Sequence, residues 1–600
     1  MPEEPPAAPA SKQKGPLPSS QRGPLPLVIG ITGHRDLRKE DDEPLRKAVR
    51  AVFDELASDY PHTPMQLISG LAEGADRLVA DVALECGIAL IACLPMEKAA
   101  YLNDFHAEES RREFDALLTK SARVVELPWE GGVPADHGPA RTQQYQALGE
   151  YIVMESQVLI ALWDGVDTKL PGGTSTVVRM QLGMQSDGGD IDPQRPLDFP
   201  ETGPVYQIVT PRVKNPKPGA EPYRIVKLCH RDTTGEAASE FHAGIFKRMD
   251  AFNEDALKRG FTLVANRDKS RGRLLPDDVR SGAAAPLEGM TRNYALASAL
   301  AAHYQELTRR SMRMLFFDTG LSAAFLFACF GHGPEALQFA ALLLYVAAAL
   351  LALGVFFYAE RRQFKTKYLD YRALTEGLRL QIFWRLAGLR ENVADYYLRK
   401  QKTDLDWIRN AVRVWNTECS GANVEPNLEL VRDLWVKDQC RFFERAAKRD
   451  EHHSEVEKRW SQWLLGATLA IAVVLILTMS CSKGLRGDIL RSDIFERFGH
   501  PEYKMELHGV IVMIMGMLPA VAGVMAGFSL KMAYGEQKKQ YQRMWKLFNR
   551  GSECLNQALA KEDRALALRT ILDLGREALE ENGDWVLLHR ERTLEMRLGG

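Results

Sequence analysis

The stretch Leu27-Val28-Ile29-Gly30-Ile31-Thr32-Gly33-His34-Arg35-Asp36-Leu37 combines a short apolar run with two glycines and a cluster of polar side chains. The apolar run predicts a buried β-strand, and the glycines predict a tight turn at its end. Glycine lets the backbone turn sharply and approach a ligand closely, and free N–H groups at such a turn bind anions, phosphate above all. Because a single Gly-x-x-Gly pair is a weak signal, a strand and turn without a ligand is the alternative for this stretch alone.

Apolar runs and amphipathic stretches alternate along the chain after this strand. The expected strands are 65–70, 88–94, 123–127, 156–163 and 205–210, and the expected helices are 42–59, one ending near 86, 105–119 and 141–155. Strands that alternate with helices predict a Rossmann-like α/β fold, with a parallel sheet covered by helices on both faces. Ligands of such sheets bind beyond the carboxyl ends of the strands.

Glycine-bearing turns follow three of the expected strands. They are Gly30-x-x-Gly33, the segment 70–74, and Gly172-Gly173, which opens a further helix. Because the carboxyl ends of parallel strands meet at one edge of a sheet, we expect the three turns to converge on one crevice. The candidate ligand-binding residues are Gly30, Thr32, Gly33, His34, Arg35, Ser69, Gly70, Glu73, Gly74, Ala75, Asp76, Asp164, Gly172, Gly173, Thr174 and Ser175.

Single side chains in this set have alternative roles. Arg35 can pair with phosphate through its planar guanidinium, or it is an ordinary surface arginine. Asp76 and Glu73 can each hydrogen-bond a ribose hydroxyl or cap the helix that begins beside them. Asp164 directly follows a buried strand, where carboxylates often face a ligand. His34 is expected to be a turn residue and not a catalytic base.

Three motifs carry a resemblance to a known family. Ile31-Thr32-Gly33-His34-Arg35, Ser69-Gly70-Leu71-Ala72-Glu73-Gly74-Ala75-Asp76, and Asp164-Gly165 followed by Gly172-Gly173-Thr174 resemble the SLOG superfamily. That superfamily includes DprA-like proteins and LOG nucleotide phosphoribohydrolases, and it is similar to the N-terminal region of melastatin-type TRP channels. The resemblance covers about residues 27–215. It implies a domain that binds a nucleotide-derived signal, of cyclic-nucleotide or ADP-ribose type, with no metal or other cofactor.

One departure from the family pattern bears on catalysis. LOG hydrolases carry Pro-Gly-Gly-x-Gly-Thr-x-x-Glu, and the glutamate serves catalysis. Here the segment reads Pro171-Gly172-Gly173-Thr174-Ser175-Thr176-Val177-Val178-Arg179. Arg179 stands at the glutamate position, and an arginine cannot act as a carboxylate base. The departure favours a sensor with no catalytic residues over a hydrolase.

Composition narrows the class of protein. The chain has 600 residues, which predicts several domains, and a formal net charge of -2, which gives no sign of a nucleic-acid partner. Eight cysteines without a Cys-x-x-Cys argue against a zinc site or a disulfide framework. Residues 1–26 are rich in Pro, Ser, Ala and Gly and lack the apolar core of a signal peptide, so a disordered leader is expected.

Four apolar segments in the second half predict membrane spans, at 314–330, 336–358, 463–481 and 510–530. A buried soluble core is the alternative for any one of them. Trp460 and Trp463 stand where interfacial anchors stand. Arginine and lysine flank the first pair of spans but are missing from its turn, so both ends of that pair are expected in the cytoplasm; the second pair is less clearly oriented. Residues 216–311 are expected to be connecting loops and helices, the last of them over 287–313.

The layout of residues 312–600 resembles a second family. A helix, a hairpin of spans and charged amphipathic helices resemble the SLATT membrane modules that accompany SLOG sensors in bacterial conflict systems. Tyr371-Arg372-Ala373-Leu374-Thr375-Glu376-Gly377-Leu378-Arg379 looks like the region after their hairpin. Residues recurring at spacings of three and four, from Tyr371 to Leu389, predict one apolar helix face. Gly523-x-x-x-Gly527 permits close helix packing and favours a homo-oligomer.

These features predict an inner-membrane protein whose cytoplasmic SLOG-like domain binds a nucleotide second messenger and drives its spans to assemble or open. The expected outcome is membrane permeabilisation in anti-phage or conflict defence. The alternatives are a membrane-anchored nucleotide-processing enzyme and a scaffold with a vestigial SLOG fold. We also expect Gly33→Glu to weaken ligand binding by orders of magnitude while the domain stays folded, because a carboxylate would repel phosphate.

Overall fold

The computed structural model describes residues 22–129, 138–168, 170–184, 202–230, 235–318, 320, 322–323, 325–326, 335–397, 405–419, 424–480, 507–532 and 534–591. The chain divides into two units. Unit 1 comprises residues up to 296 together with 377–382 and 390–424, and unit 2 comprises the remainder.

A seven-stranded sheet forms the centre of unit 1, with the strand order β4-β3-β2-β1-β5-β6-β7. The strands are β1 (Leu27–Gly33), β2 (Met65–Ser69), β3 (Ala89–Leu94), β4 (Arg123–Glu126), β5 (Val158–Trp163), β6 (Val205–Val209) and β7 (Ile225–Leu228). The predicted parallel sheet is confirmed from β4 to β6. The antiparallel edge strand β7 was not predicted, because it lies in a stretch of Gly, Pro and Asp that indicates loops.

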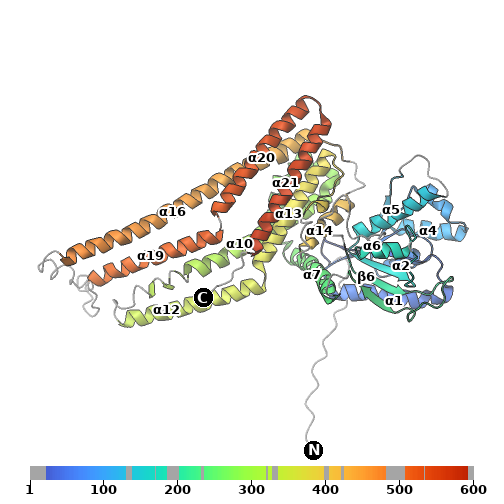
Figure 1. Cartoon of the computed structure of the whole chain (residues 1–600), viewed down its shortest axis with the longest axis horizontal. Helices are drawn as coiled ribbons and strands as arrows, with labels where there is room; N and C mark the ends of the chain where they lie inside the picture. The colour runs from blue at the N-terminus through green and yellow to red at the C-terminus, as the bar shows by residue number, and fades with distance from the viewer. Residues whose placement is uncertain are drawn as a thin grey trace, which may run out of the picture. The chain divides into compact units, whose positions relative to one another are not determined.

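Helices cover both faces of the sheet, as Figure 1 shows. Those of this region are α1 (Asp42–Asp59), α2 (Ala75–Glu85), α3 (Lys98–Tyr101), α4 (Glu108–Lys120), α5 (Pro139–Glu155) and α6 (Thr174–Gln181). α2 packs on α1 and α4 at one face, and α5 packs on α6 at the other. Two glycines of β1 point to opposite faces: Gly33 meets Ala75 of α2, and Gly30 meets Ile152 of α5. This arrangement follows from right-handed crossovers that run in two directions from β1.

Unit 1 also takes in segments that the sequence assigned elsewhere. It contains α7 (Gly235–Arg259), α8 (Val264–Leu274), α9 (Asp277–Ser281), the start of α10 (Glu288–Arg313) and α14 (Asp406–Glu418). The leader expected over residues 1–26 extends too far, because Leu25 is part of unit 1. The Leu25 amide donates to Asn253 Oδ1 at 2.9 Å, and Leu25 is fully buried. Residues 1–21 lie outside the described part of the chain.

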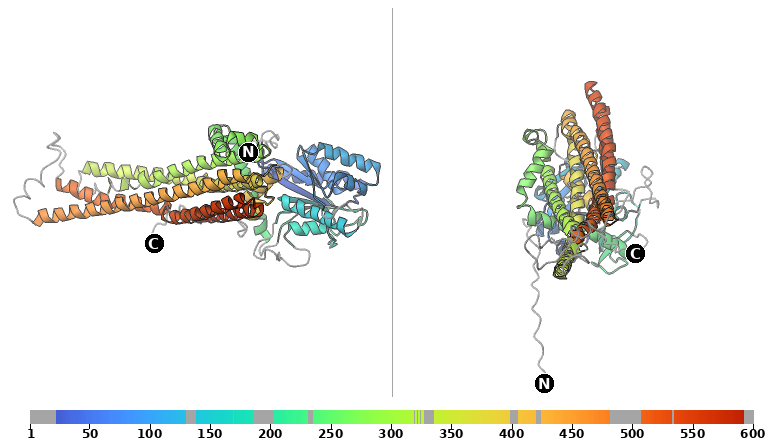
Figure 2. Two further views of the ribbon diagram at one scale, coloured as in Figure 1. Left: turned by 90° about the horizontal axis from the view of Figure 1, so that it is seen from above. Right: turned by 90° about the vertical axis from the view of Figure 1, so that its left-hand side faces the viewer.

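Unit 2 is helical in its described residues. Its helices are α12 (Glu335–Arg361), α13 (Phe364–Ala387, shared with unit 1), α15 (Leu428–Val431), α16 (Lys437–Ser480), α19 (Leu507–Met532), α20 (Tyr534–Ala560) and α21 (Arg564–Glu591). α16 packs along α19 and α20, and Figure 2 shows these long helices from two further directions. The predicted apolar face from Tyr371 to Leu389 is confirmed, since its six residues are buried.

Three described helices are long and apolar enough to cross a membrane: Gln338–Arg361, Leu428–Leu477 and Gly509–Gly527. They contain most of the second, third and fourth predicted spans. The first predicted span, 314–330, is not among them, and much of it lies outside the described residues; Met314–Asp318 forms a π-helix. Large apolar side chains on the long helices are exposed, including Leu350 and Leu469, which water would solvate poorly. This pattern is consistent with membrane association.

Candidate functional site

The order of the strands reverses at β1, which has β2 on one side and β5 on the other. In open α/β sheets, ligands bind in the crevice beyond the carboxyl ends of the strands at such a switch point. His34 follows β1 and Asp164 follows β5, so both lie at this edge. The crevice expected from the sequence would therefore lie between the segments that follow these two strands.

The Asp164 side chain is a buried anchor within this edge. It is fully shielded from solvent, and its Oδ2 accepts from Arg212 Nε at 2.9 Å and from Asn215 Nδ2 at 3.1 Å. Its Oδ1 accepts from the Val166 amide at 3.1 Å. Burial acts to raise the pKa of Asp164, but the hydrogen bonds outweigh burial and hold that pKa below its usual range. The carboxylate thus joins the loops after β5 and β6, and its side chain is buried among their residues.

His34 is bound to the same anchor. Its Nε2 lies 3.2 Å from the Asp164 amide nitrogen and 3.1 Å from Asp164 Oδ1. Burial lowers the pKa of His34, and the positive charge of Arg212 acts in the same direction. The His34 side chain is therefore held by Asp164, in the segment that follows β1.

The first two glycine turns are locked together. A Cβ on Gly33 would lie 2.3 Å from Ala75 Cβ, and a Cβ on Gly74 would lie 2.5 Å from the Arg35 carbonyl oxygen. The Ala75 amide also donates to the His34 carbonyl at 3.1 Å. Gly33 therefore has no room for any side chain. This overturns the expectation that Gly33→Glu leaves the domain folded, because that variant would disrupt the packing of α2 on β1.

Side chains of the second turn hold the turn itself. Ser69 Oγ accepts from the Leu71 amide at 3.1 Å, and Asp76 Oδ2 accepts from the Ala72 amide at 3.3 Å. Glu73 accepts a hydrogen bond from Ser110 of α4. The N-cap of α2 is Gly74, with no side-chain cap, so neither Glu73 nor Asp76 takes the capping role. Burial raises the pKa of Asp76 to about 6.

The third turn packs against α5, at Tyr145 and Gln146. Gly172 has φ +69, and a Cβ there would lie 3.1 Å from the Gln146 amide nitrogen. Gly173 is the N-cap of α6, Thr174 begins that helix, and Ser175 Oγ accepts from the Thr168 amide at 3.3 Å. Two further candidates lie within strand β1: Thr32 pairs with Ala161, and Gly30 lies under Ile152, so Gly30 is a packing glycine.

An aromatic pair that the sequence did not single out joins the three turns. The Arg35 guanidinium lies 5.3 Å from the centre of the Tyr145 ring, and Tyr145 stands 6.3 Å from Tyr101. The Tyr101 hydroxyl donates to the Gly70 carbonyl at 3.0 Å. The Tyr145 hydroxyl is buried with no hydrogen-bond partner in the described structure. A signal was present, because Tyr145 lies in the first half of the helix that precedes β5, and such a helix begins near the carboxyl edge of a parallel sheet.

Arg35 is the exposed cation of this edge. Its guanidinium lies over the Tyr145 ring, and among the described residues no carboxylate forms an ion pair with it, although its charge acts to lower the pKa of Asp76. The amides of Thr174 and Ser175 at the start of α6 likewise have no acceptor recorded in the described part of the chain. A cation, a helix N-terminus and aromatic rings are suited to a ligand with phosphate groups and a planar base.

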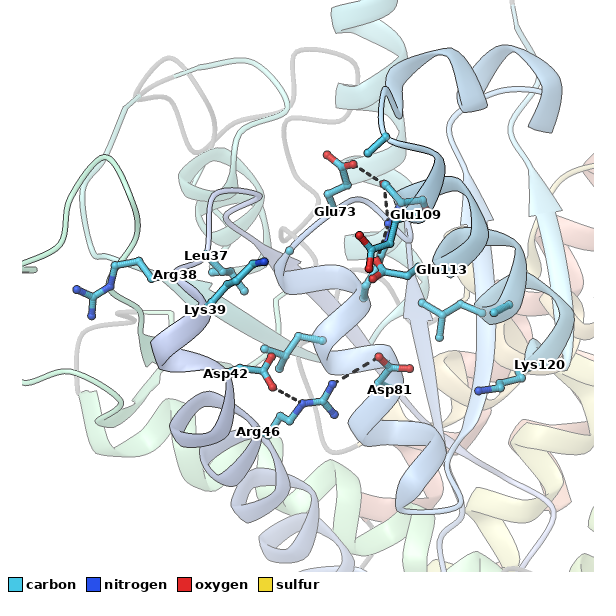
Figure 3. A pocket seen from close by; sticks show the side chains of 17 residues that line it. Leu37, Arg38, Lys39, Asp42, Arg46, Glu73, Asp81, Glu109, Glu113 and Lys120 are labelled. Carbon is cyan, nitrogen blue, oxygen red and sulfur yellow. Dashed lines mark hydrogen bonds and ion pairs between the residues drawn. The ribbon is translucent and has the colours of Figure 1, made fainter.

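A cavity of about 550 Å³ opens at the other face of the second turn, between α1, α2 and α4. Glu73 and Gly74 line it, and its charged walls carry both signs. Figure 3 shows Arg46 directed toward Asp42 and Asp81, with which it forms ion pairs of 2.8 and 3.6 Å. Because these charges are paired within the walls, the cavity has no clear preference for an anion or a cation.

Arg179, at the position of the LOG glutamate, points to a carboxylate of its own chain. Its Nη1 donates to Asp167 Oδ2 at 3.2 Å, in the loop that follows β5. No group of three or more His, Cys, Asp or Glu side chains in the described residues could hold a metal ion.

No family model matches the chain, and no curated protein matches it. Among solved structures, it is similar to the X-ray structure of DNA processing protein A (DprA) from Streptococcus pneumoniae, at 19% identity and a TM-score of 0.17. The match covers 23% of this chain and 41% of that chain, so this chain spans less than half the length of DprA. This likeness is weak.

Proposed function

We propose that this protein is a nucleotide-signal sensor of SLOG type joined to a membrane effector of SLATT type. The observation that carries the sensor half is Arg35: an exposed cation over the Tyr145 ring, beside the segments of the three glycine turns. Its partner would be the phosphate groups of a nucleotide-derived messenger, with Tyr145 beside a base. Cyclic oligonucleotides and ADP-ribose-type compounds are the proposed ligand classes.

The side chains at the crevice favour binding over catalysis. Asp164 is buried and saturated, and Glu73 is held by Ser110. Arg179 replaces a glutamate and pairs with Asp167. A hydrolase needs a carboxylate or another base within reach of the substrate, so these contacts speak against the nucleotide-processing alternative.

The effector half rests on the apolar helices. Three of them have the length and composition of membrane spans, and α10 runs as one helix from Glu288 to Arg313 across the boundary of the two units. We propose that ligand binding shifts the helices toward an assembled or open state, in a homo-oligomer of the inner membrane with unit 1 in the cytoplasm. The consequence would be depolarisation and growth arrest in anti-phage defence.

The test is a ligand panel on the full chain in detergent, with ADP-ribose and cyclic di- and trinucleotides, read by isothermal titration calorimetry. Arg35→Ala should weaken binding about 10- to 150-fold, the effect of losing a charged hydrogen bond. Arg112→Ala, which removes an exposed arginine paired with Glu108 on α4, is the matched control and should bind as wild type. Wild-type affinity in Arg35→Ala would place the site elsewhere.

A second experiment tests the effector. Expression with the binding compound should depolarise cells, followed with a potential-sensitive dye. Arg35→Ala should abolish the response, and so should deletion of residues 314–358. A toxic response that survives this deletion would refute the membrane effector and point to a soluble activity.

A further inference from the structure

Helix α14 (Asp406–Glu418) belongs to unit 1 although it lies in the sequence between apolar helices α12 and α16. It packs on α7 and α5. Trp415 Nε1 donates to the Pro24 carbonyl at 3.2 Å, and Phe252 of α7 contacts the rings of both Trp407 and Trp415. The chain that carries the apolar helices is therefore anchored in the α/β unit by a helix of its own.

The end of α14 lies at the amino edge of the sheet, opposite the crevice. The Thr417 hydroxyl donates to Glu155, the last residue of α5, and Arg123 at the start of β4 donates to the Thr417 carbonyl. The Glu418 side chain is hydrogen-bonded to Gln66 of β2. Burial raises the pKa of Glu155, opposed by Arg413 of α14. α14 thus docks through a polar cluster to which two strands and α5 contribute.

Helix α5 connects this cluster with the crevice. Tyr145, under the Arg35 guanidinium, and Glu155, under Thr417, are ten positions apart on one helix. At a rise of 1.5 Å per residue they are about 15 Å apart along its axis. One helix therefore contacts the proposed ligand at one end and α14 at the other.

Helix α5 packs closely on the sheet. A Cβ on Gly30 would lie 2.8 Å from Ile152 Cγ2, and a Cβ on Gly70 would lie 2.9 Å from Leu148 Cδ2. Both glycines let α5 approach the strands closely. Because packed elements of this kind shift as bodies and do not deform continuously, a displacement at Tyr145 carries to Glu155.

We propose that α5 couples the crevice to α14, so that occupation of the crevice and the Glu155–Thr417 contact are thermodynamically linked. This coupling rests on the proposed function for its biological meaning, but the link itself is a property of the protein without ligand. It gives the α/β unit a route to the membrane helices through α14, in addition to the continuous helix α10. Reciprocity requires that a change at α14 alters the crevice by the same factor.

The test is amide hydrogen exchange of the full chain in detergent, without ligand, comparing wild type with Thr417→Val. This variant keeps the side-chain shape and removes the hydroxyl that donates a hydrogen bond to Glu155. Exchange in residues 406–418 should rise at least about tenfold, the effect of a lost hydrogen bond to a charged group. If the coupling holds, amide exchange should also rise, by about fivefold or more, in residues 141–147 and 170–174 at the proposed site.

Thr119→Val is the matched control, since the hydroxyls of Thr417 and of Thr119 on α4 both lie within hydrogen-bond distance of the carbonyl four residues earlier, at 2.9 and 2.8 Å, but that of Thr119 has no carboxylate partner among the described residues. Thr417→Ser should restore wild-type exchange at both ends of α5. A rise confined to 406–418 and the last turn of α5 would overturn the proposal.

A second readout uses ADP-ribose as the probe. Thr417→Val should change the affinity for ADP-ribose by a certain factor. ADP-ribose should change the amide exchange of residues 406–418 in wild type by the same factor. Equal affinity in both proteins refutes the coupling. If wild type does not bind ADP-ribose, that result counts against this ligand class of the proposed function, and the ligand-free exchange data still decide the coupling.

Discussion

Gly33→Ala adds a single methyl group at the point where β1, α2 and β5 meet. The new Cβ would lie 2.3 Å from Ala75 Cβ and 3.0 Å from both Leu162 Cβ and the Leu162 carbonyl oxygen. Carbon atoms in contact prefer about 3.5 to 4.0 Å, so the start of α2 has to move by more than about 1 Å. That movement stretches the hydrogen bond from the Ala75 amide to the His34 carbonyl.

The magnitude follows from these two effects. Overpacking in a core costs about 1–3 kcal/mol, and a lost backbone hydrogen bond adds about 1 kcal/mol. We therefore expect Gly33→Ala to destabilise unit 1 by about 2–4 kcal/mol, the sum of those costs. Ala75→Gly removes the atom that collides. Combined with Gly33→Ala it should recover part of the loss, with a coupling of about 1–2 kcal/mol in the range for residues in contact.

These differences in the free energy of unfolding can be measured by pulse proteolysis of the full chain across a urea gradient. Fragments of unit 1 are identified by mass. Gly244→Ala is the control, because a Cβ at Gly244 in α7 meets no atom within 4 Å. That variant should be neutral or slightly stabilising, as alanine favours a helix. If Gly33→Ala matched this control, or if the double variant equalled the sum of its singles, the locking of the two turns by this contact would be refuted.

Three further results are expected. Burial raises the pKa of Asp76 to about 6, against about 3.9 for an aspartate in an unfolded chain, so the folded state binds the proton more tightly. Stability from this group is complete below about pH 4 and falls, by up to about 3 kcal/mol, as pH rises through 6. Asp76→Asn should remove that slope from proteolysis midpoints measured between pH 4 and 7.5, and an unchanged slope would assign it to another group. Asp164→Ala should cost about 3–5 kcal/mol by leaving Arg212 without its buried partner, whereas Glu73→Ala, at the cavity wall, should cost less than about 1.5 kcal/mol; equal losses would contradict the anchor role of Asp164. In a cysteine-free background, an impermeant thiol reagent on intact cells should label a cysteine at position 333 and miss one at position 35, and labelling of position 35 from outside would reverse the topology.

Much of the α/β unit could be predicted because its signals are local. Helix α1 has the bounds expected from the sequence, and six strands lie where apolar runs end in turn residues. The strand β7 was missed because four residues at a sheet edge, half-buried, carry no long apolar run. The second and third glycine turns were found for the same local reason, because each follows a buried strand, whereas Gly30 and Gly33 of the first lie within β1 itself.

The roles of the site residues depended on three-dimensional packing. The sequence identified Asp164 as polar and well placed, but only the folded chain surrounds it with Arg212 and Asn215, from a segment about fifty positions away, and so buries it. It identified Arg35 as a possible phosphate ligand, but the ring beneath Arg35 comes from α5, more than a hundred residues later. Tyr145 belongs to no sequence motif, because the residues that surround it come from three turns that are far apart in the chain.

The sequence by itself therefore determined the class of the first half, the places of six of its strands, and the presence of long apolar helices. Each of these is written in short-range patterns of apolar, glycine and charged residues. Tertiary structure alone decided that α14 belongs with the α/β unit, that Gly33 is closed to any side chain, and that α5 runs from the crevice to Thr417. These are contacts between segments far apart in the chain, and no local pattern specifies which distant surface a buried face will meet.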